Sequence, residues 1–160
     1  MVERKYLAHF IDAAFDTTFA ATNYVRLGKD LEEYNEELNP DVETTKNILG
    51  EQSVKHNGYE VQADVDPFYY DYDEALAEKI MSIVNERSTG DKCKTSILTV
   101  LLDEEGAVKW AYREDCMVIP TSVGGDTAGI QTPFSVYMAG NRTKGTFVIN
   151  TKKFTPDESL

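Results

Sequence analysis

Apolar and polar residues alternate through much of this chain, as they do in strands with one buried face. The clearest case runs from Tyr59 to Val65, where every odd-numbered residue is apolar and every even-numbered residue is polar. Asp66-Pro67 then ends the pattern. The other segments predicted as strands are Tyr6–Ile11, Tyr24–Leu27, Thr95–Leu102, Val108–Tyr112, Cys116–Val123, Phe134–Ala139 and Thr146–Asn150.

One segment has the helical period instead. From about Asp73 to Arg87, apolar residues including Leu76, Ile80 and Ile83 recur at helical spacing and form a single stripe. Asp71 or Asp73 is positioned to cap the first turn. These elements predict a mainly β fold, a β-sandwich or barrel of about seven or eight strands with one flanking α-helix.

Two further segments are predicted as loops. Gly140–Gly145 lies between the last two strands and reads as a hairpin loop. Residues 152–160 are polar and are expected to be loosely held. With 160 residues the chain is long enough for one core and short for two, so we expect a single domain over residues 1–160.

The stretch from Leu27 to Gly58 is too polar and too long for an ordinary connection in a compact domain. We expect a long polar loop at about residues 28–58, with a helical turn between Asp30 and Glu37 that Asn39-Pro40 would end. Its scattered apolar residues need a surface to lie on, and we infer that another copy of the chain provides it. The candidate anchors of this inter-subunit loop are Leu31, Tyr34, Leu38, Ile48 and Leu49.

The chain is strongly acidic: 28 Asp and Glu against 16 Lys and Arg give a net charge of −12. That balance argues against a protein that grips nucleic-acid phosphates, and it suits either simple solubility or a surface that repels DNA. No apolar run reaches the roughly 18 residues of a membrane span, so no membrane partner is expected. His9 and Asp12 interrupt the N-terminal apolar stretch, which therefore does not resemble a signal peptide.

The side chains that carry chemistry form no recognisable catalytic or metal-binding motif. Cys93 and Cys116 are far apart and read as small, partly buried residues. His9 and His56 each lack a neighbouring signature of catalysis. The carboxylates of Asp64, Asp66, Asp71 and Asp73 resemble a cation cluster, but strand-end solvation and helix capping explain them more simply. We therefore predict no catalytic residue, no cofactor and no metal.

Aromatic residues gather just before the predicted helix. Phe68-Tyr69-Tyr70 and Tyr72 favour helix–sheet packing, with a subunit interface as the alternative. A platform for stacking nucleic-acid bases is the weakest interpretation, because the cluster has no basic neighbours.

Several short motifs follow one another along the chain, with the predicted helix beginning near Asp73 between the fourth and the fifth. The motifs are Tyr24-Val25-Arg26-Leu27-Gly28, Asn39-Pro40, Glu43-Thr44-Thr45, Asn57-Gly58-Tyr59-Glu60-Val61, Gly124-Gly125-Asp126 and Lys144-Gly145-Thr146. Their order, over nearly the whole chain from about residue 6 to 155, resembles the major tail protein, or tail tube protein, of long-tailed bacteriophages from Gram-positive hosts and related prophages.

The resemblance implies a structural virion protein whose copies form hexameric rings that stack into the tail tube. Such a tube conducts DNA during ejection without binding it specifically, and its acidic lumen keeps the DNA from sticking. Implied partners are further copies of the chain, the tape measure protein, the tail terminator and tail-tip proteins. The implied location is the virion tail, and the host cytoplasm during assembly.

Three alternatives remain open from the sequence. The inner tube of a contractile tail or tailocin is a close variant of the same function. A monomeric acidic β-sandwich could instead bind a basic partner through Asp30–Glu37. A small enzyme would need a pocket around Asp64, Asp66, Asp71 or His56.

Overall fold

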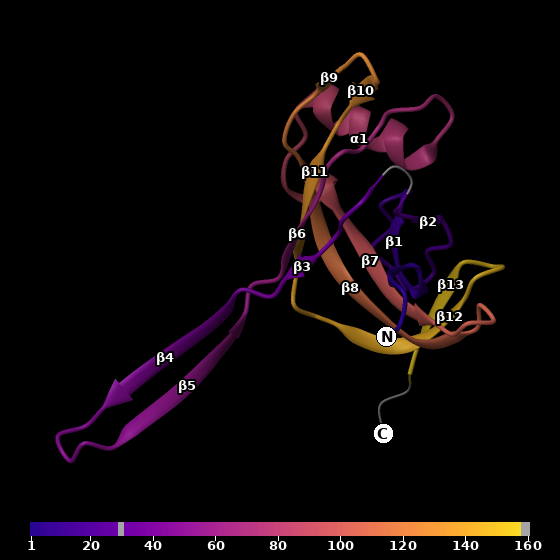
Figure 1. The fold of residues 1–160 in the computed structure, drawn as a ribbon. Helices are drawn as coiled ribbons and strands as arrows, with labels where there is room; N and C mark the ends of the chain where they lie inside the picture. Colours follow the sequence, from indigo (N-terminus) through magenta and orange to yellow (C-terminus); the bar gives the residue numbers. More distant parts are fainter. Residues whose placement is uncertain (29–30, 158–160) are drawn as a thin grey trace.

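The computed structural model describes residues 1–28 and 31–157, which are mainly β with one α-helix (Figure 1). The predicted fold class, a β-sandwich with a flanking helix, is confirmed. Among the described residues the strands outnumber the seven or eight expected, since nine form one sheet and four more form two separate ribbons.

The main sheet is antiparallel throughout, in the order β2-β1-β7-β8-β11-β6-β3, with β12 and β13 attached beside β8. The order follows the chain only in part, since β1 pairs with β7 and β6 pairs with β11. Its strands are β1 (Leu7–Asp12), β2 (Tyr24–Arg26), β3 (Glu36–Glu37), β6 (Gln62–Val65), β7 (Lys94–Leu102), β8 (Val108–Pro120), β11 (Phe134–Met138), β12 (Thr143–Val148) and β13 (Lys153–Pro156).

Two hairpins lie outside that sheet. One is the short ribbon of β9 (Gly124–Asp126) and β10 (Gly129–Gln131), which replaces the loop expected at residues 124–129. The other is the long hairpin of β4 (Pro40–Lys46) and β5 (Gln52–Tyr59). The remaining elements are the α-helix α1 (Ala75–Glu86) and two 3-10 turns, η1 (Arg4–Tyr6) and η2 (Gly90–Cys93).

The sheet buries apolar side chains on both of its faces, because successive residues of a strand point to opposite sides. One core holds Ile11, Ile97 and Val118 and lies under α1, whose Leu76 and Ile80 reach into it. The second core belongs to the opposite face and contains Phe10, Leu98, Val100, Tyr24, Phe147 and Phe154.

Strand β8 organises the sheet. Two predicted strands, Val108–Tyr112 and Cys116–Val123, are one continuous strand. On one edge β8 pairs with β7; on the other it pairs first with β11, at residues 116–120, and then with β12, at residues 111–113. Gly140–Gly145 is therefore not a hairpin loop, because β11 and β12 follow each other along the same edge of β8. Glu114 and Asn141 fill the interruption by accepting hydrogen bonds from backbone amides.

Helix α1 occupies the predicted segment, with Leu76, Ala77, Ile80 and Ile83 buried. The N-cap residue is Glu74, not Asp71 or Asp73, and the Glu74 side chain makes no capping hydrogen bond. Asp73 instead adopts a left-handed conformation with φ of 67°, so the chain turns sharply at the position that was expected to lead into the helix.

The C-terminal segment also differs from the prediction. Residues 153–156 form β13 and pair with β12, so this part of residues 152–160 is not a loosely held tail. Phe154 is 1% exposed and belongs to the second core. The average polarity of the segment predicted a loose tail, whereas its one aromatic residue, Phe154, is the side chain that fixes it to the core. Residues 158–160 of the predicted tail lie outside the described residues.

Candidate subunit interface

The polar segment predicted as a loop at residues 28–58 contains an ordered hairpin. Strands β4 and β5 pair over their whole length and project from the body of the molecule as an arm (Figure 1). Every residue of β4 is exposed, and so is nearly every residue of β5. The helical turn expected between Asp30 and Glu37 is absent from the described part of that range, since residues 31–35 form no regular secondary structure and residues 36–37 form β3.

The strand register gives the arm two different faces. Val42 lies opposite His56 and Thr44 lies opposite Val54, so these side chains share one face. On the other face Glu43 lies opposite Lys55, and the hydroxyls of Thr45 and Ser53 are hydrogen-bonded at 2.7 Å. The arm thus has one mildly apolar face and one polar face, although no part of the body covers either.

The tip of the arm presents two adjacent aliphatic side chains to solvent. Ile48 is 102% exposed and Leu49 is 77% exposed. Asn47 fixes the turn because its side-chain oxygen accepts hydrogen bonds from the amides of Leu49 and Glu51, at 2.9 and 3.0 Å. The turn therefore has a defined shape and holds the two aliphatic side chains outward.

The structure divides the predicted inter-subunit residues into two groups. Leu38, Ile48 and Leu49 are exposed on or beside the arm. Tyr34 is only 6% exposed, and both Tyr34 and the half-buried Leu31 pack on the first core of their own chain. Leu31 and Tyr34 therefore anchor the root of the arm to the body. The sequence alone could not distinguish this role from contact with a neighbouring subunit.

A partly buried polar cluster lies beneath the root of the arm, with His9 buried and Arg4 exposed. Arg4 donates a hydrogen bond to His9 Nε2 at 3.1 Å and another to the Tyr34 carbonyl at 3.1 Å. Glu36, the first residue of β3, accepts a hydrogen bond from Thr99 at 3.2 Å and lies 3.5 Å from His9 Nδ1. The cluster ties the N-terminal turn to the strand that leads into the arm.

Burial shapes the ionisation of this cluster. Desolvation, reinforced by the nearby Arg4, Arg26 and Arg142, lowers the pKa of His9 to about 4. Desolvation raises the pKa of Glu36, although Thr99 and the arginines oppose that shift. Because Arg4 donates to Nε2, the neutral His9 ring carries its proton on Nδ1, facing Glu36.

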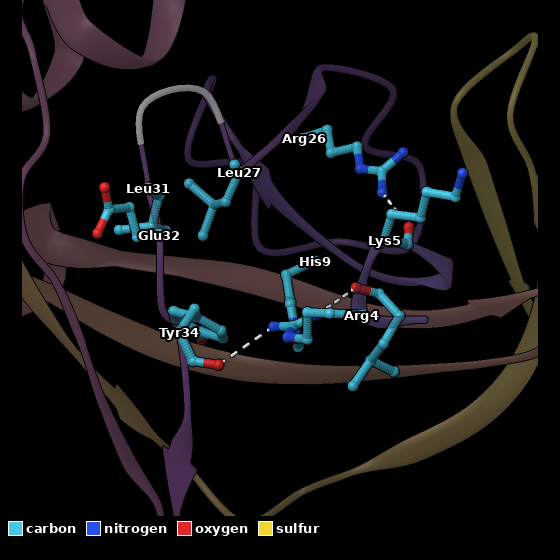
Figure 2. Close-up of a pocket in the computed structure, with 10 residues that line it drawn as sticks. Arg4, Lys5, His9, Arg26, Leu27, Leu31, Glu32 and Tyr34 are labelled. Atoms are coloured by element: carbon cyan, nitrogen blue, oxygen red, sulfur yellow. Dashed lines mark hydrogen bonds between the residues drawn. The ribbon is translucent and has the colours of Figure 1, made fainter. Parts of the chain in front are cut away.

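An open pocket of about 490 Å³ lies beside this cluster (Figure 2). Its lining combines apolar and basic side chains: Leu7, Leu27, Leu31 and Tyr34 with Arg4, Lys5 and Arg26, together with His9, Gly28 and Glu32. Arg26 donates to the Lys5 carbonyl at 2.6 Å. Sequence reasoning missed this pocket, because its residues come from three separate segments and form no local motif.

The residues considered for chemistry are dispersed. His56 is on the exposed arm beside Tyr59, with ring centroids 4.6 Å apart. Asp64 accepts a hydrogen bond from Ser135 at 2.6 Å on the sheet. Within residues 1–28 and 31–157, no three His, Cys, Asp or Glu side chains are grouped so as to hold a metal ion. Cys93 and Cys116 are buried free thiols, and burial raises the pKa of both.

The aromatic cluster before α1 is used partly for packing. The Phe68 ring meets Phe134 edge to face at 5.1 Å between centroids, and Tyr70 donates to Glu78 of α1 at 2.7 Å. Tyr72 remains 82% exposed. Helix–sheet packing thus explains Phe68 and Tyr70. In the described part of the chain, no helix has the length and apolar character needed to cross a membrane.

No protein-family model matches the sequence, and neither does any curated protein. Solved structures do match in three dimensions. The cap of the anti-feeding prophage, described as a tube-terminating cap, aligns with a TM-score of 0.52 and 14% identity over 91% of each chain. The sheath/tube terminator of an extracellular contractile injection system, in its extended state, aligns with a TM-score of 0.56 and 10% identity. That alignment covers 91% of this chain and 97% of the terminator.

The chain shares their fold. At these identities the match is one of fold, and it extends over nearly the whole length of all three chains. The sequence resemblance pointed to a tail tube protein, whereas these two proteins end a tube.

Proposed function

We propose that this protein is a structural, self-assembling subunit of a bacteriophage tail or a related tail-like particle, and that it forms a ring at the end of the tube. The observation that carries the proposal is the exposed arm of β4 and β5. A two-stranded ribbon is marginally stable by itself in water, and this one leaves Val42, Val54, Ile48 and Leu49 exposed. Packing on a neighbouring subunit would bury these exposed apolar side chains and stabilise the hairpin.

The fold supports the placement in a tail. Both structural neighbours terminate a tube, one of them in a contractile injection system, and both align over nearly their full length. The short strands β2 and β3 at the two ends of the main sheet leave backbone groups available for pairing with another subunit. A contact between two different surfaces generates a closed ring when the rotation between subunits divides a full turn.

The candidate anchors divide accordingly. In the proposed assembly Leu38, Ile48 and Leu49 contact the neighbour, while Leu31 and Tyr34 hold the base of the arm in place. The net charge of −12 would let DNA pass a ring without adhering to it. The protein acts as a scaffold and catalyses no reaction. Its partners are other copies of itself and the components of the tube.

A second candidate is the tail tube subunit itself, building stacked hexameric rings, in a contractile or a non-contractile particle. The order of motifs along the sequence favours this candidate. Tube subunits add ring upon ring, whereas a terminator ends the tube, so the two candidates predict assemblies of different length.

Electron microscopy of concentrated protein tests both, together with light scattering across a range of concentrations. Discrete closed rings are expected of a terminator, and tubes of indefinite length of a tube subunit. The control replaces residues 40–59 with a short Gly-Ser linker; it should keep the spectroscopic signature of the folded body and lose assembly. A strictly monomeric protein at every concentration, alone and with preassembled tubes, would refute both candidates.

A further inference from the structure

The arm and the pocket of Figure 2 are complementary in chemistry. The tip offers Ile48 and Leu49, followed by the carboxylate of Glu51. The pocket is lined by apolar side chains that include Leu27 and Tyr34 and by the basic Arg4, Lys5 and Arg26, with Glu32 as the acidic residue among its lining residues. We propose that the arm tip of one copy inserts into this pocket on the next copy. The inference rests on the proposed function and names the two surfaces that meet.

The tip has the features needed of the inserted part. Its two aliphatic side chains are adjacent and almost fully exposed, and the turn that carries them is fixed by Asn47. A preorganised turn loses little conformational freedom on binding. Glu51 lies two residues beyond Leu49 and is exposed, so a carboxylate accompanies the aliphatic pair into any site that it enters.

The pocket has the features needed of the receiving part. At about 490 Å³ it is within the range of roughly 300–1,000 Å³ that ligand-binding pockets occupy. Arg4 and Arg26 donate to backbone carbonyls at its wall. No carboxylate of the described residues lies within ion-pair distance of either guanidinium. In a chain with 28 acidic and 16 basic residues, two such arginines beside an apolar lining favour an acidic segment that also carries apolar side chains.

Geometry indicates that the occupant comes from another copy. The arm points away from the body that carries the pocket (Figure 1). A strand rises about 3.3 Å per residue, so the seven residues of β4 carry the tip about 20 Å beyond the root. Since tip and pocket are different surfaces, the contact runs head to tail, and it closes a ring when the rotation between subunits divides a full turn.

Site-directed crosslinking tests this contact in the full-length protein. Ile48→Cys is combined with Glu32→Cys at the exposed edge of the pocket, and assembled protein is treated with a short bismaleimide. The native Cys93 and Cys116 are buried and should react slowly. The matched control pairs Ile48→Cys with Ile130→Cys, another exposed aliphatic position on the body. We expect intermolecular crosslinking about tenfold above that of the control.

A charge exchange provides an independent measurement. Arg26→Glu and Glu51→Lys should each raise the concentration needed for half-maximal assembly about tenfold, which corresponds to about 1.4 kcal/mol. The two together should restore much of the loss, because the pair is rebuilt with its charges exchanged. Circular dichroism and thermal melting confirm that each variant is folded.

The outcomes separate the inference from the proposed function. Assembly with crosslinking from residue 48 to residue 32, and with recovery in the exchanged variant, supports both. Assembly with crosslinking no higher than the control overturns the tip-in-pocket contact and leaves the structural role intact. Absence of assembly under all conditions overturns both.

Discussion

Burial of His9 makes the stability of this protein depend on pH in a way that can be calculated. The imidazole is 5% exposed, and desolvation together with Arg4, Arg26 and Arg142 lowers its pKa from 6.5 to about 4. Between pH 6.5 and about pH 4, His9 is protonated in the unfolded chain but remains neutral in the folded chain. Stability is therefore fully present above pH 6.5 and is lost as pH falls toward 4.

The magnitude follows from the same values. At about 1.4 kcal/mol per pKa unit, the full effect is about 3 kcal/mol, and about 2 kcal/mol of it develops between pH 7 and pH 5. Glu36 changes stability with pH in the opposite direction. Burial raises its pKa, so the folded state binds a proton more readily than the unfolded state and gains stability as pH falls. A variant without His9 but with Glu36 intact separates the two contributions.

Urea unfolding of the wild type and of His9→Gln at pH 7 and pH 5 provides the measurement. A glutamine can accept from Arg4 and donate toward Glu36, but it does not titrate. Wild-type protein should lose about 2 kcal/mol more than the variant between the two pH values, a midpoint difference of roughly 1 M urea. His56→Gln, on the exposed arm, is the matched control and should follow the wild type. Parallel pH dependence in wild type and His9→Gln would refute the reasoning.

Three further experiments test the packing of β12 and β13 and the role of the arm tip. Phe154→Ala should lower the free energy of unfolding by about 3–5 kcal/mol, measured with denaturant, because it leaves a cavity in the second core. The control, Val148→Ala at an exposed position of β12, should lower it by less than about 0.5 kcal/mol. Equal losses of stability in the two variants would contradict the assignment of β13. Gly145→Ala places a Cβ 2.5 Å from the Phe154 ring and should lower stability by about 1–3 kcal/mol, so an unchanged melting temperature would count against the close contact of β12 and β13. Ile48→Ser with Leu49→Ser, at the exposed tip, should leave the melting temperature of the monomer within about 2 °C while it weakens assembly in light scattering; undiminished assembly would show that the tip is not an interface.

Local patterns predicted those elements whose own residues carry the signal. The helical stripe of Leu76, Ile80 and Ile83 located α1, and the alternation at Ala63 and Val65 located β6. The predicted strand Tyr59–Val65 is wrong in its first half, because Tyr59 ends the exposed strand β5 and β6 begins at Gln62. In both cases one face of the element meets the core, so burial and sequence period agree. The fold class follows from elements of this kind.

The arm could not be recognised in that way. β4 and β5 have Val42 and Val54 as their aliphatic residues and bury neither, so no contrast between a buried and an exposed face was present in the sequence. Its pairing depends on the Asn47 turn and on contacts between the strands themselves. Of the five apolar residues singled out in this segment, Leu38, Ile48 and Leu49 are exposed, whereas Leu31 and Tyr34 pack on the first core of the body.

The sequence by itself determined that the chain is an acidic, mainly β protein with one amphipathic helix and a polar segment that lacks a core of its own. Only the tertiary structure decided that Arg4, His9, Arg26 and Glu36 meet around one pocket and its partly buried cluster, and that Tyr34 closes onto it. The physical reason is that strand periodicity is a local property of the sequence. The cluster instead depends on two long-range arrangements, the pairing of β1 with β7 and the placement of β3 at the other end of the main sheet from β2.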